Sequence, residues 1–167
     1  APWYARTMSY TGTIVQVSVS PGGVPKLPVP QARVTANGIE GDGHDHPDIH
    51  GGPERALCIY ALERIEGLAA EGHDLAPGHT GENITIRGID WDLVVPGARF
   101  KLGAEVEVEV TRFTTPCKTN ARWFKGGDFN RMHHNLFPGW SRAYARVIST
   151  GTVRPGDVVE LIPPASA

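Results

Sequence analysis

The chain has 167 residues, a length typical of one domain built around one hydrophobic core. Hydrophobic residues make up 40% and charged residues 20% of the sequence, which excludes a disordered or fibrous protein. The 16 basic and 18 acidic residues leave a net charge of −2, so we expect no nucleic-acid partner and no anionic membrane surface as partner.

The two cysteines, Cys58 and Cys117, are too few for a disulfide framework in a domain of this size. Residues 1–6 lack the basic stretch and following apolar stretch of a signal peptide. No segment is long and apolar enough to span a membrane. We therefore expect a cytoplasmic protein.

Frequent turns divide the chain into short elements, because it contains 20 glycines and 14 prolines. Alternating apolar residues predict a first strand at 13–19. Four prolines between 21 and 30 would interrupt a strand ladder, so this stretch is predicted to be a loop. Residues 38–52 are rich in Gly, Asp and His and lack an apolar period. They predict a long loop, and long loops inside compact domains are usually functional.

One amphipathic helix is predicted in the middle of the chain. Leu62, Ile65 and Leu68 lie at helical spacing, and Gly72 would end the helix. The clearest strand is 104–111, where three valines alternate with three glutamates that we expect to face solvent. Further strands are predicted at 55–60, 83–87, 146–149 and 158–162.

The segments 94–102 and 153–161 match in spacing around a Pro-Gly pair. The pattern is typical of two similar hairpins with Pro-Gly turns, and an ancient duplication is the alternative. Many short strands with one clear helix predict a single, mainly β domain. We expect a β-barrel or a coiled mixed sheet with small helices at one end.

Cys117 is the strongest candidate for chemistry. It follows Pro116 at the end of the clearest strand, and Arg112, Lys118 and Arg122 are near it in sequence. A helix beginning at Lys118 would place Cys117 at its N-terminus, where helix dipole and cations should lower the thiol pKa. Such a thiolate could attack, carry sulfur or bind a soft metal. A buried structural cysteine is the alternative, and Cys58, in an apolar run, is interpreted that way.

The loop 42–52 contains three histidines and three aspartates, which suggests zinc. Its spacing matches no recurrent zinc pattern, and Pro47 with the glycines excludes a helix. Gly51 and Gly52 would instead let backbone N–H groups approach an anion, and Arg55 would add a charged contact. The segment 78–83 indicates either the edge of a polar pocket or a glycine turn.

Several short motifs occur together in one order along the chain. They are Gly38–Asp42, His50–Ala56, Gly81–Asn83, Pro116–Cys117, Tyr144–Val147 and Gly156–Asp157. In this order and spacing they closely resemble the MOSC domain, the C-terminal domain of molybdenum cofactor sulfurases, which also occurs alone in small bacterial proteins. The resemblance covers about residues 11–162, so we assign the domain there and an N-terminal extension to residues 1–10.

The resemblance implies a β-barrel like the barrel domain of pyruvate kinase, and molybdenum cofactor (molybdopterin) as the ligand. Cys117 corresponds to the cysteine that coordinates molybdenum in cofactor-binding relatives, and is the expected catalytic and metal-binding residue. Residues around the motifs are expected to bind the rest of the cofactor. These are Asp42, His50, Gly51, Gly52, Arg55, Gly81, Glu82, Asn83, Arg112, Lys118 and Arg122.

Two functions follow from this resemblance. Some relatives reduce N-hydroxylated compounds, including amidoximes and hydroxylaminopurines, and such a reductase would need an external electron donor. In the sulfurases the domain is linked to sulfur delivery, so the alternative is a non-catalytic carrier with a persulfide on Cys117, loaded by a cysteine desulfurase. No Schiff-base lysine is evident, so no pyridoxal phosphate is expected on this chain. A plain metal hydrolase is a third, more distant possibility.

Overall fold

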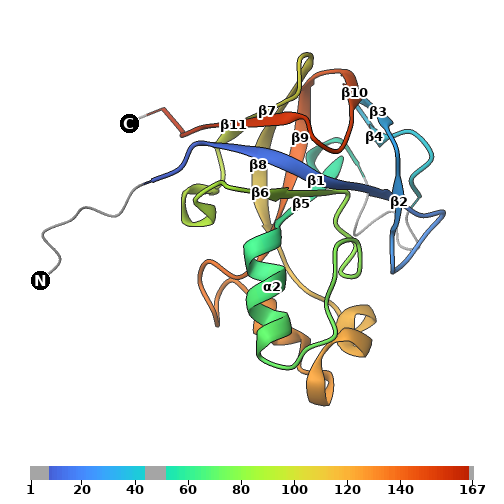
Figure 1. Cartoon of the computed structure of the whole chain (residues 1–167), viewed down its shortest axis with the longest axis vertical. Helices are drawn as coiled ribbons and strands as arrows, with labels where there is room; N and C mark the ends of the chain where they lie inside the picture. Colours follow the sequence, from blue (N-terminus) through green and yellow to red (C-terminus); the bar gives the residue numbers. More distant parts are fainter. Residues whose placement is uncertain (1–7, 44–51, 166–167) are drawn as a thin grey trace, which may run out of the picture.

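The computed structural model describes residues 8–43 and 52–165 (Figure 1). Its single α-helix of several turns is α2 (Leu62–Ala70), and the other helices are short 3-10 turns. The strands are β1 (Thr11–Val19), β2 (Leu27–Val29), β3 (Ala32–Thr35), β4 (Gly38–Ile39), β5 (Leu57–Ala61), β6 (Ile84–Arg87), β7 (Arg99–Leu102), β8 (Val106–Thr114), β9 (Arg142–Ser149), β10 (Gly151–Val153) and β11 (Val158–Ile162). The 3-10 helices are η1 (Pro53–Arg55), η2 (Trp91–Leu93), η3 (Lys118–Trp123), η4 (Lys125–Gly127) and η5 (Phe129–Met132).

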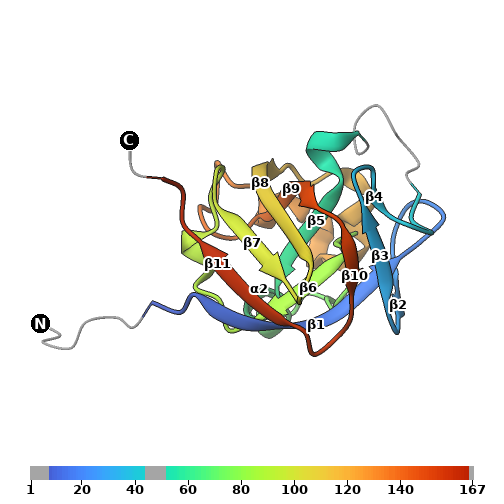
Figure 2. The same ribbon diagram turned by 90° about the horizontal axis from the view of Figure 1, so that it is seen from above.

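Seven strands close into a barrel (Figure 2). They follow one another in the order β11-β7-β8-β9-β5-β6-β1, and β1 pairs with β11 to close the ring. All neighbours are antiparallel except β5 and β6. Strand β2 extends the ladder beyond β1, and β10, β3 and β4 form a second small sheet. The expected mainly β, single-barrel fold with a few short helices is therefore confirmed.

Strand β1 joins three neighbours along its length. Residues 11–13 pair with β11, residues 13–17 with β6, and residues 17–19 with β2. A register shift between Ile14 and Gln16 marks a bulge, which lets the strand bend as it passes between partners. A side chain at Gly12 would come within 2.0 Å of the Arg87 carbonyl oxygen, so the crossing with β6 requires glycine.

The core follows from strict alternation along the strands. In β8, the predicted valines are buried, while Glu107 and Glu109 point outward and pair with Arg99 and Arg146 at 3.2 and 3.1 Å. Phe100 and other large apolar side chains of the barrel strands are fully buried. Because alternate residues point to opposite faces, this pattern fixes the register of each strand.

Two predicted loops contain strands. Within 21–30, residues 27–29 form β2 and pair with β1 despite Pro28. A proline fits there because β2 is the last strand of its ladder, where one row of backbone groups has no partner strand. Within 38–52, residues 38–39 form β4. The strands predicted at 104–111 and 146–149 are longer than expected, reaching Thr114 and beginning at Arg142.

Both Pro-Gly pairs form turns, with Ala98 and Asp157 donating backbone hydrogen bonds three residues back. The predicted hairpins are wrong, however. Strand β10, before the second turn, pairs with β3, and the first turn follows η2 rather than a strand. The strands that follow the two turns, β7 and β11, pair with each other instead. In both segments, the Pro-Gly turn therefore leads directly into a strand of the barrel.

The helix predicted from Leu62 is α2, with Ile65 and Leu68 buried. It lies below the barrel in Figure 1, as does the chain around η3 to η5. None of the helices in the described ranges is long and apolar enough to cross a membrane.

Candidate functional site

The pocket that contains Cys117 lies against strands β5 and β9. Cys58 of β5 is paired with Tyr144 of β9, and Ile59 with Ala143. Alternation then places Cys58 and Tyr144 on the face opposite to Ile59 and Ala143. This face meets the loops before β2 and β6 and the start of η3, which together enclose a pocket of about 640 Å³, counting space open to solvent.

The pocket lining combines two thiols, three cations and several neutral polar groups. Cys58 and Cys117 supply the thiols. The cations are Lys26, Arg55 and Arg142. The other polar side chains in the lining are Thr80, Asn83, Thr119, Asn120 and Tyr144. Since no carboxylate is among the described lining residues, the site favours an anionic ligand.

The predicted site residues divide into three groups. Cys117, Arg55, Gly81 and Asn83 line the pocket together. His50 and Gly51 lie outside the described residues. The remaining predicted site residues that the structure describes are not part of the lining. They are Asp42, Gly52, Glu82, Arg112, Lys118 and Arg122. Arg112, Lys118 and Arg122 have exposed side chains.

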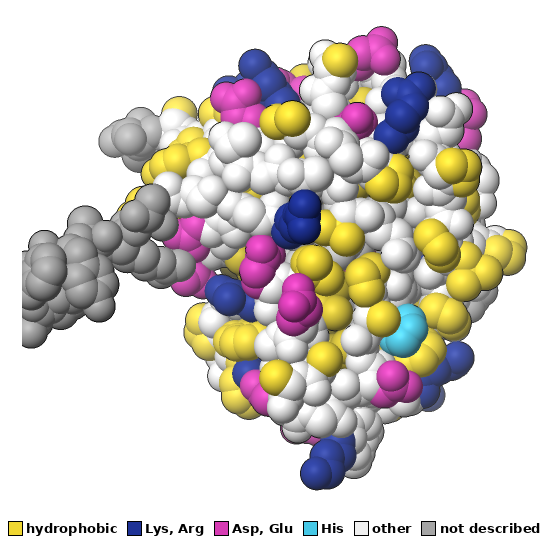
Figure 3. Space-filling view, viewed as in Figure 1, with side chains coloured by type: hydrophobic (Ala, Val, Ile, Leu, Met, Phe, Trp, Pro, Cys, Tyr) yellow, Lys and Arg dark blue, Asp and Glu magenta, His cyan; other side chains and the backbone are white. Residues whose placement is uncertain are grey.

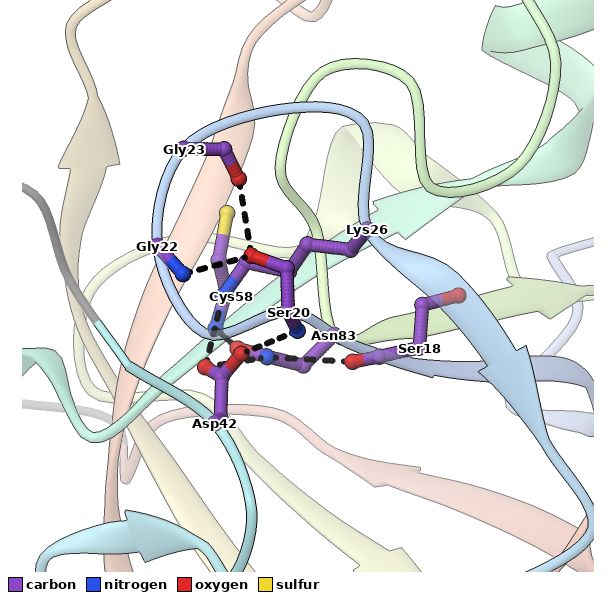
Figure 4. A network of polar contacts seen from close by, with 8 residues as sticks. All are labelled: Ser18, Ser20, Gly22, Gly23, Lys26, Asp42, Cys58 and Asn83. Carbon is purple, nitrogen blue, oxygen red and sulfur yellow. Dashed lines mark hydrogen bonds and ion pairs between the residues drawn. The ribbon is translucent and has the colours of Figure 1, made fainter.

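Asp42 acts behind the pocket wall, in the network of Figure 4. Its Oδ1 accepts a hydrogen bond from the Ser20 backbone N–H at 3.0 Å. Its Oδ2 accepts from Lys26 Nζ at 2.6 Å and from Asn83 Nδ2 at 2.9 Å. The Oδ1 of Asn83 in turn accepts from the Cys58 backbone N–H at 3.0 Å. Asp42 thus ties the lysine that lines the pocket to strand β5.

Glu82 is completely buried and also has a structural set of partners. Its two carboxylate oxygens accept hydrogen bonds from the hydroxyls of Thr80 and Thr85, at 2.9 and 3.1 Å. These bonds brace the turn before β6, which presents Thr80 and Gly81 to the pocket. The carboxylate therefore shapes the site without lining it.

Arg142 was not predicted from the sequence, yet it is the most unusual residue of the pocket. It is only 6% exposed, and its Nη1 donates to the Thr80 carbonyl at 2.6 Å. The Nε is buried without a hydrogen-bond partner, and no carboxylate within the described ranges pairs with the guanidinium. A buried charge is costly unless it is paired, so this arrangement favours an anion in the pocket.

Cys117 lies at the position before η3, in extended backbone geometry. The predicted helix after Cys117 thus exists as a 3-10 helix, and the predicted fall in the thiol pKa stays a prediction. The Cys117 sulfur is 2.8 Å from the Thr119 hydroxyl. The side chain is partly exposed, so ligand or reagent can reach it.

Tyr144 lines the same pocket as the two thiols and lies near a cation. The Arg55 guanidinium is 5.8 Å from the centre of the Tyr144 ring. Burial, and then the neighbouring Cys58 and Cys117 thiols, raise the pKa of Tyr144 to about 12, against the lowering effect of Arg142 and Arg55. The phenol therefore remains a hydrogen-bond donor at neutral pH.

Cys58 is 5% exposed, as predicted, and its sulfur is 3.8 Å from the Thr114 hydroxyl. Burial raises the pKa of this thiol. The sequence did not indicate that Cys58 and Cys117 share one pocket. Among the described residues, no group of three or more His, Cys, Asp or Glu side chains could hold a metal ion. Most of the His-rich loop considered for zinc lies outside those residues.

Comparison with known proteins decides the family. The family model of the MOSC domain matches residues 46–160. The chain belongs to the MOSC domain family. It is 30% identical over 162 residues to the uncharacterized protein YflK of Bacillus subtilis, covering 94% of this chain and 68% of YflK. It is also 30% identical to protein YiiM of Escherichia coli over 161 residues, covering 92% of this chain and 70% of YiiM.

The crystal structure of Escherichia coli YiiM has the same fold as this MOSC protein. The superposition has a TM-score of 0.70 at 26% identity, and covers 94% of this chain and 72% of that structure. A third relative is a protein named reductase from Gibberella moniliformis, 31% identical over 135 residues. The match covers 77% of this chain but only 23% of that reductase.

Proposed function

We propose that this MOSC protein binds molybdenum cofactor through Cys117 and reduces N-hydroxylated compounds. The observation that carries the proposal is one pocket that holds a reachable thiol and a buried guanidinium whose Nε has no partner. A ligand that brings both a soft metal and an anionic group fits both features. The relative named reductase adds support for redox chemistry.

The residues of the pocket fit such a cofactor by their chemistry. A thiolate is a soft ligand and suits a sulfur-ligated metal, so Cys117, the more accessible thiol, would hold the metal. Arg142 and Arg55 would hold the anionic part, since guanidinium groups bind phosphate through two parallel hydrogen bonds. The neutral amides of Asn83 and Asn120 would bond the polar ring edge. When bound, the cofactor supplies the two-electron chemistry, and the protein supplies binding and orientation.

The test is metal and pterin analysis of protein purified without oxygen from a host that makes the cofactor. We expect molybdenum and pterin in equal amounts with the chain, and reduction of an amidoxime by the loaded protein with dithionite-reduced methyl viologen. X-ray absorption should detect a sulfur ligand that is absent in Cys117→Ser. Folded wild-type protein without molybdenum or pterin would contradict the proposal.

A second candidate is a sulfur carrier with a persulfide on Cys117. The observation that favours it is the partly exposed thiol at the start of η3, within hydrogen-bond distance of a hydroxyl that could stabilise a terminal sulfur. The partner would be a cysteine desulfurase. Incubation with a desulfurase and cysteine should then add the mass of one sulfur atom to Cys117. This mass increment in protein free of molybdenum would favour the carrier over the reductase.

A further inference from the structure

Three cations that were expected to bind the cofactor near Cys117 are exposed and do not line the pocket. Arg112, Lys118 and Arg122 are exposed and absent from the pocket lining. Together they form what we term the cationic rim. Lys118 directly follows Cys117, and Arg122 reaches from the end of η3 to the carbonyl of Val24, a lining residue, at 3.3 Å. Arg112 is the strand partner of Tyr144, which also lines the pocket.

The rim cations lie in a segment, residues 110–127, whose charge contrasts with that of the rest of the chain. Residues 110–127 contain four cations and no carboxylate, although the whole chain carries a net charge of −2. None of the three rim side chains forms an ion pair within the described ranges. On the face in Figure 3, basic and acidic side chains lie interspersed over the surface. Unpaired charges of one sign beside a site attract a partner of the opposite sign.

We propose that the cationic rim is the docking surface for an acidic electron-transfer protein. The inference rests on the proposed reductase function, because a reductase on this chain requires an external donor. Reduction of one N-hydroxyl group takes two electrons and two protons: the N–O bond breaks, an N–H and an O–H bond form, and water leaves. Two reduced one-electron iron–sulfur proteins supply the electrons and are oxidised.

A protein donor fits this surface better than a nucleic acid does. Nucleic-acid binding proteins spread basic charge over a wide face and usually have a basic total charge. Here the chain has a net charge of −2, and the three rim cations adjoin, contact or pair with residues that line the pocket of the proposed metal ligand. That is where an electron donor must bind, since electron transfer needs a close approach.

The test compares two double variants with matched charge changes. Lys118→Glu/Arg122→Glu reverses two rim charges, and Arg33→Glu/Arg87→Glu reverses two exposed cations on β3 and β6. Binding of an acidic [2Fe–2S] ferredoxin to the cofactor-free proteins is measured by calorimetry at low ionic strength. We expect the rim variant to weaken binding by at least about tenfold, and the control by less than about twofold. About 0.5 M salt should weaken wild-type binding similarly through screening.

The loaded proteins provide the second readout. The ratio of ferredoxin-driven to methyl viologen-driven amidoxime reduction should fall by about tenfold in the rim variant only. An unchanged ratio with unchanged ferredoxin binding would overturn the docking surface. So would rim-dependent binding to vesicles of anionic lipid without binding to ferredoxin. If methyl viologen drives no reduction in loaded wild type, the reductase function fails, while binding to the cofactor-free proteins still decides the surface.

Discussion

The two cysteines of this protein line the same pocket from different kinds of structure. Cys58 lies on strand β5, fixed in the barrel ladder and 5% exposed, with the Thr114 hydroxyl as its neighbour. Cys117 lies after strand β8 ends, at the start of a short 3-10 helix, and is partly exposed. A thiol that lines a pocket is therefore not always reactive. Its reactivity depends on how accessible the sulfur is and on the charges around it.

The same contrast applies to the cations of the pocket. Lys26 is neutralised by Asp42 at 2.6 Å, and both side chains are almost completely buried. Arg142 is equally buried but has a backbone carbonyl as its partner and a free Nε. The lysine is therefore satisfied by the protein, whereas the arginine keeps a hydrogen-bond donor that the described protein groups do not satisfy. We therefore expect Lys26 to contribute to structure and Arg142 to ligand binding.

The largest expected difference between the two thiols is their rate of alkylation. In folded, cofactor-free protein near neutral pH, Cys117 should react with iodoacetamide at least about 100-fold faster than Cys58. Burial shields Cys58 and raises its pKa, so little thiolate is present there. Peptide mass spectrometry over time measures both rates. In denaturant the two rates should converge. Faster labelling of Cys58 in folded protein would reverse the assignment.

The next effect concerns the two buried cations. Arg142→Met should lower the affinity for cofactor by about 10- to 100-fold, because a hydrogen bond to a charged group contributes about 1.5–3 kcal/mol. The free energy of unfolding should not fall, since an apolar side chain of similar length replaces an unpaired buried charge. Pterin and molybdenum per chain, with denaturant unfolding, measure the two quantities.

The control for this prediction is Lys26→Met. It leaves Asp42 buried without its cation, so here stability should fall, by about 3–5 kcal/mol as for other broken buried pairs. If Arg142→Met retained the full cofactor content, the guanidinium would have no role in binding.

The barrel was predictable from sequence because alternation is a local signal. The alternating valines of β8 specify both the strand and its buried face. Strand β2 was missed because its prolines predict a loop. Proline is tolerated in a strand at the end of a ladder, but the position of a strand in its ladder depends on topology and cannot be read from local sequence. The Pro-Gly pairs were correct as turns, but the partner of each following strand depends on contacts distant in sequence.

The candidate site was predictable in part for the same reason. Cys117 and Arg55 carry visible local signals, and the structure brings them together. Arg142 was missed because the sequence placed the start of β9 four residues later, so the side chain seemed to belong to no element. Asp42 and Glu82 were expected at the ligand because they lie in motifs that resemble the MOSC domain. Their partners, which satisfy both carboxylates within the protein, come from other segments.

A smaller effect is expected from Cys58→Ser, which should lower the free energy of unfolding by about 1–3 kcal/mol by burying a hydroxyl in place of a thiol. Cofactor content should remain that of wild type. Cys58→Ala is the matched variant, because it removes the sulfur without adding a polar group. Denaturant unfolding and pterin analysis check both. Loss of cofactor from folded Cys58→Ser would show that the buried thiol takes part in binding.

The smallest effect is a change in alkaline stability caused by Tyr144. Its pKa is raised to about 12 in the folded protein, whereas an unfolded tyrosine titrates near about 10. A folded pKa above the unfolded value contributes stability that is fully present below pH of about 10 and is lost as the pH rises toward 12. Above pH of about 10 the unfolded chain releases this proton first, so the free energy of unfolding should fall with pH.

Tyr144→Phe should reduce the steepness of that fall by up to about 1.4 kcal/mol per pH unit, the limit for one proton. Tyr10→Phe is the control, because Tyr10 is exposed. Urea unfolding at several pH values between 8 and about 11 measures the slope. Equal slopes in wild type and Tyr144→Phe would mean that the phenol titrates in the folded protein as it does in the unfolded chain.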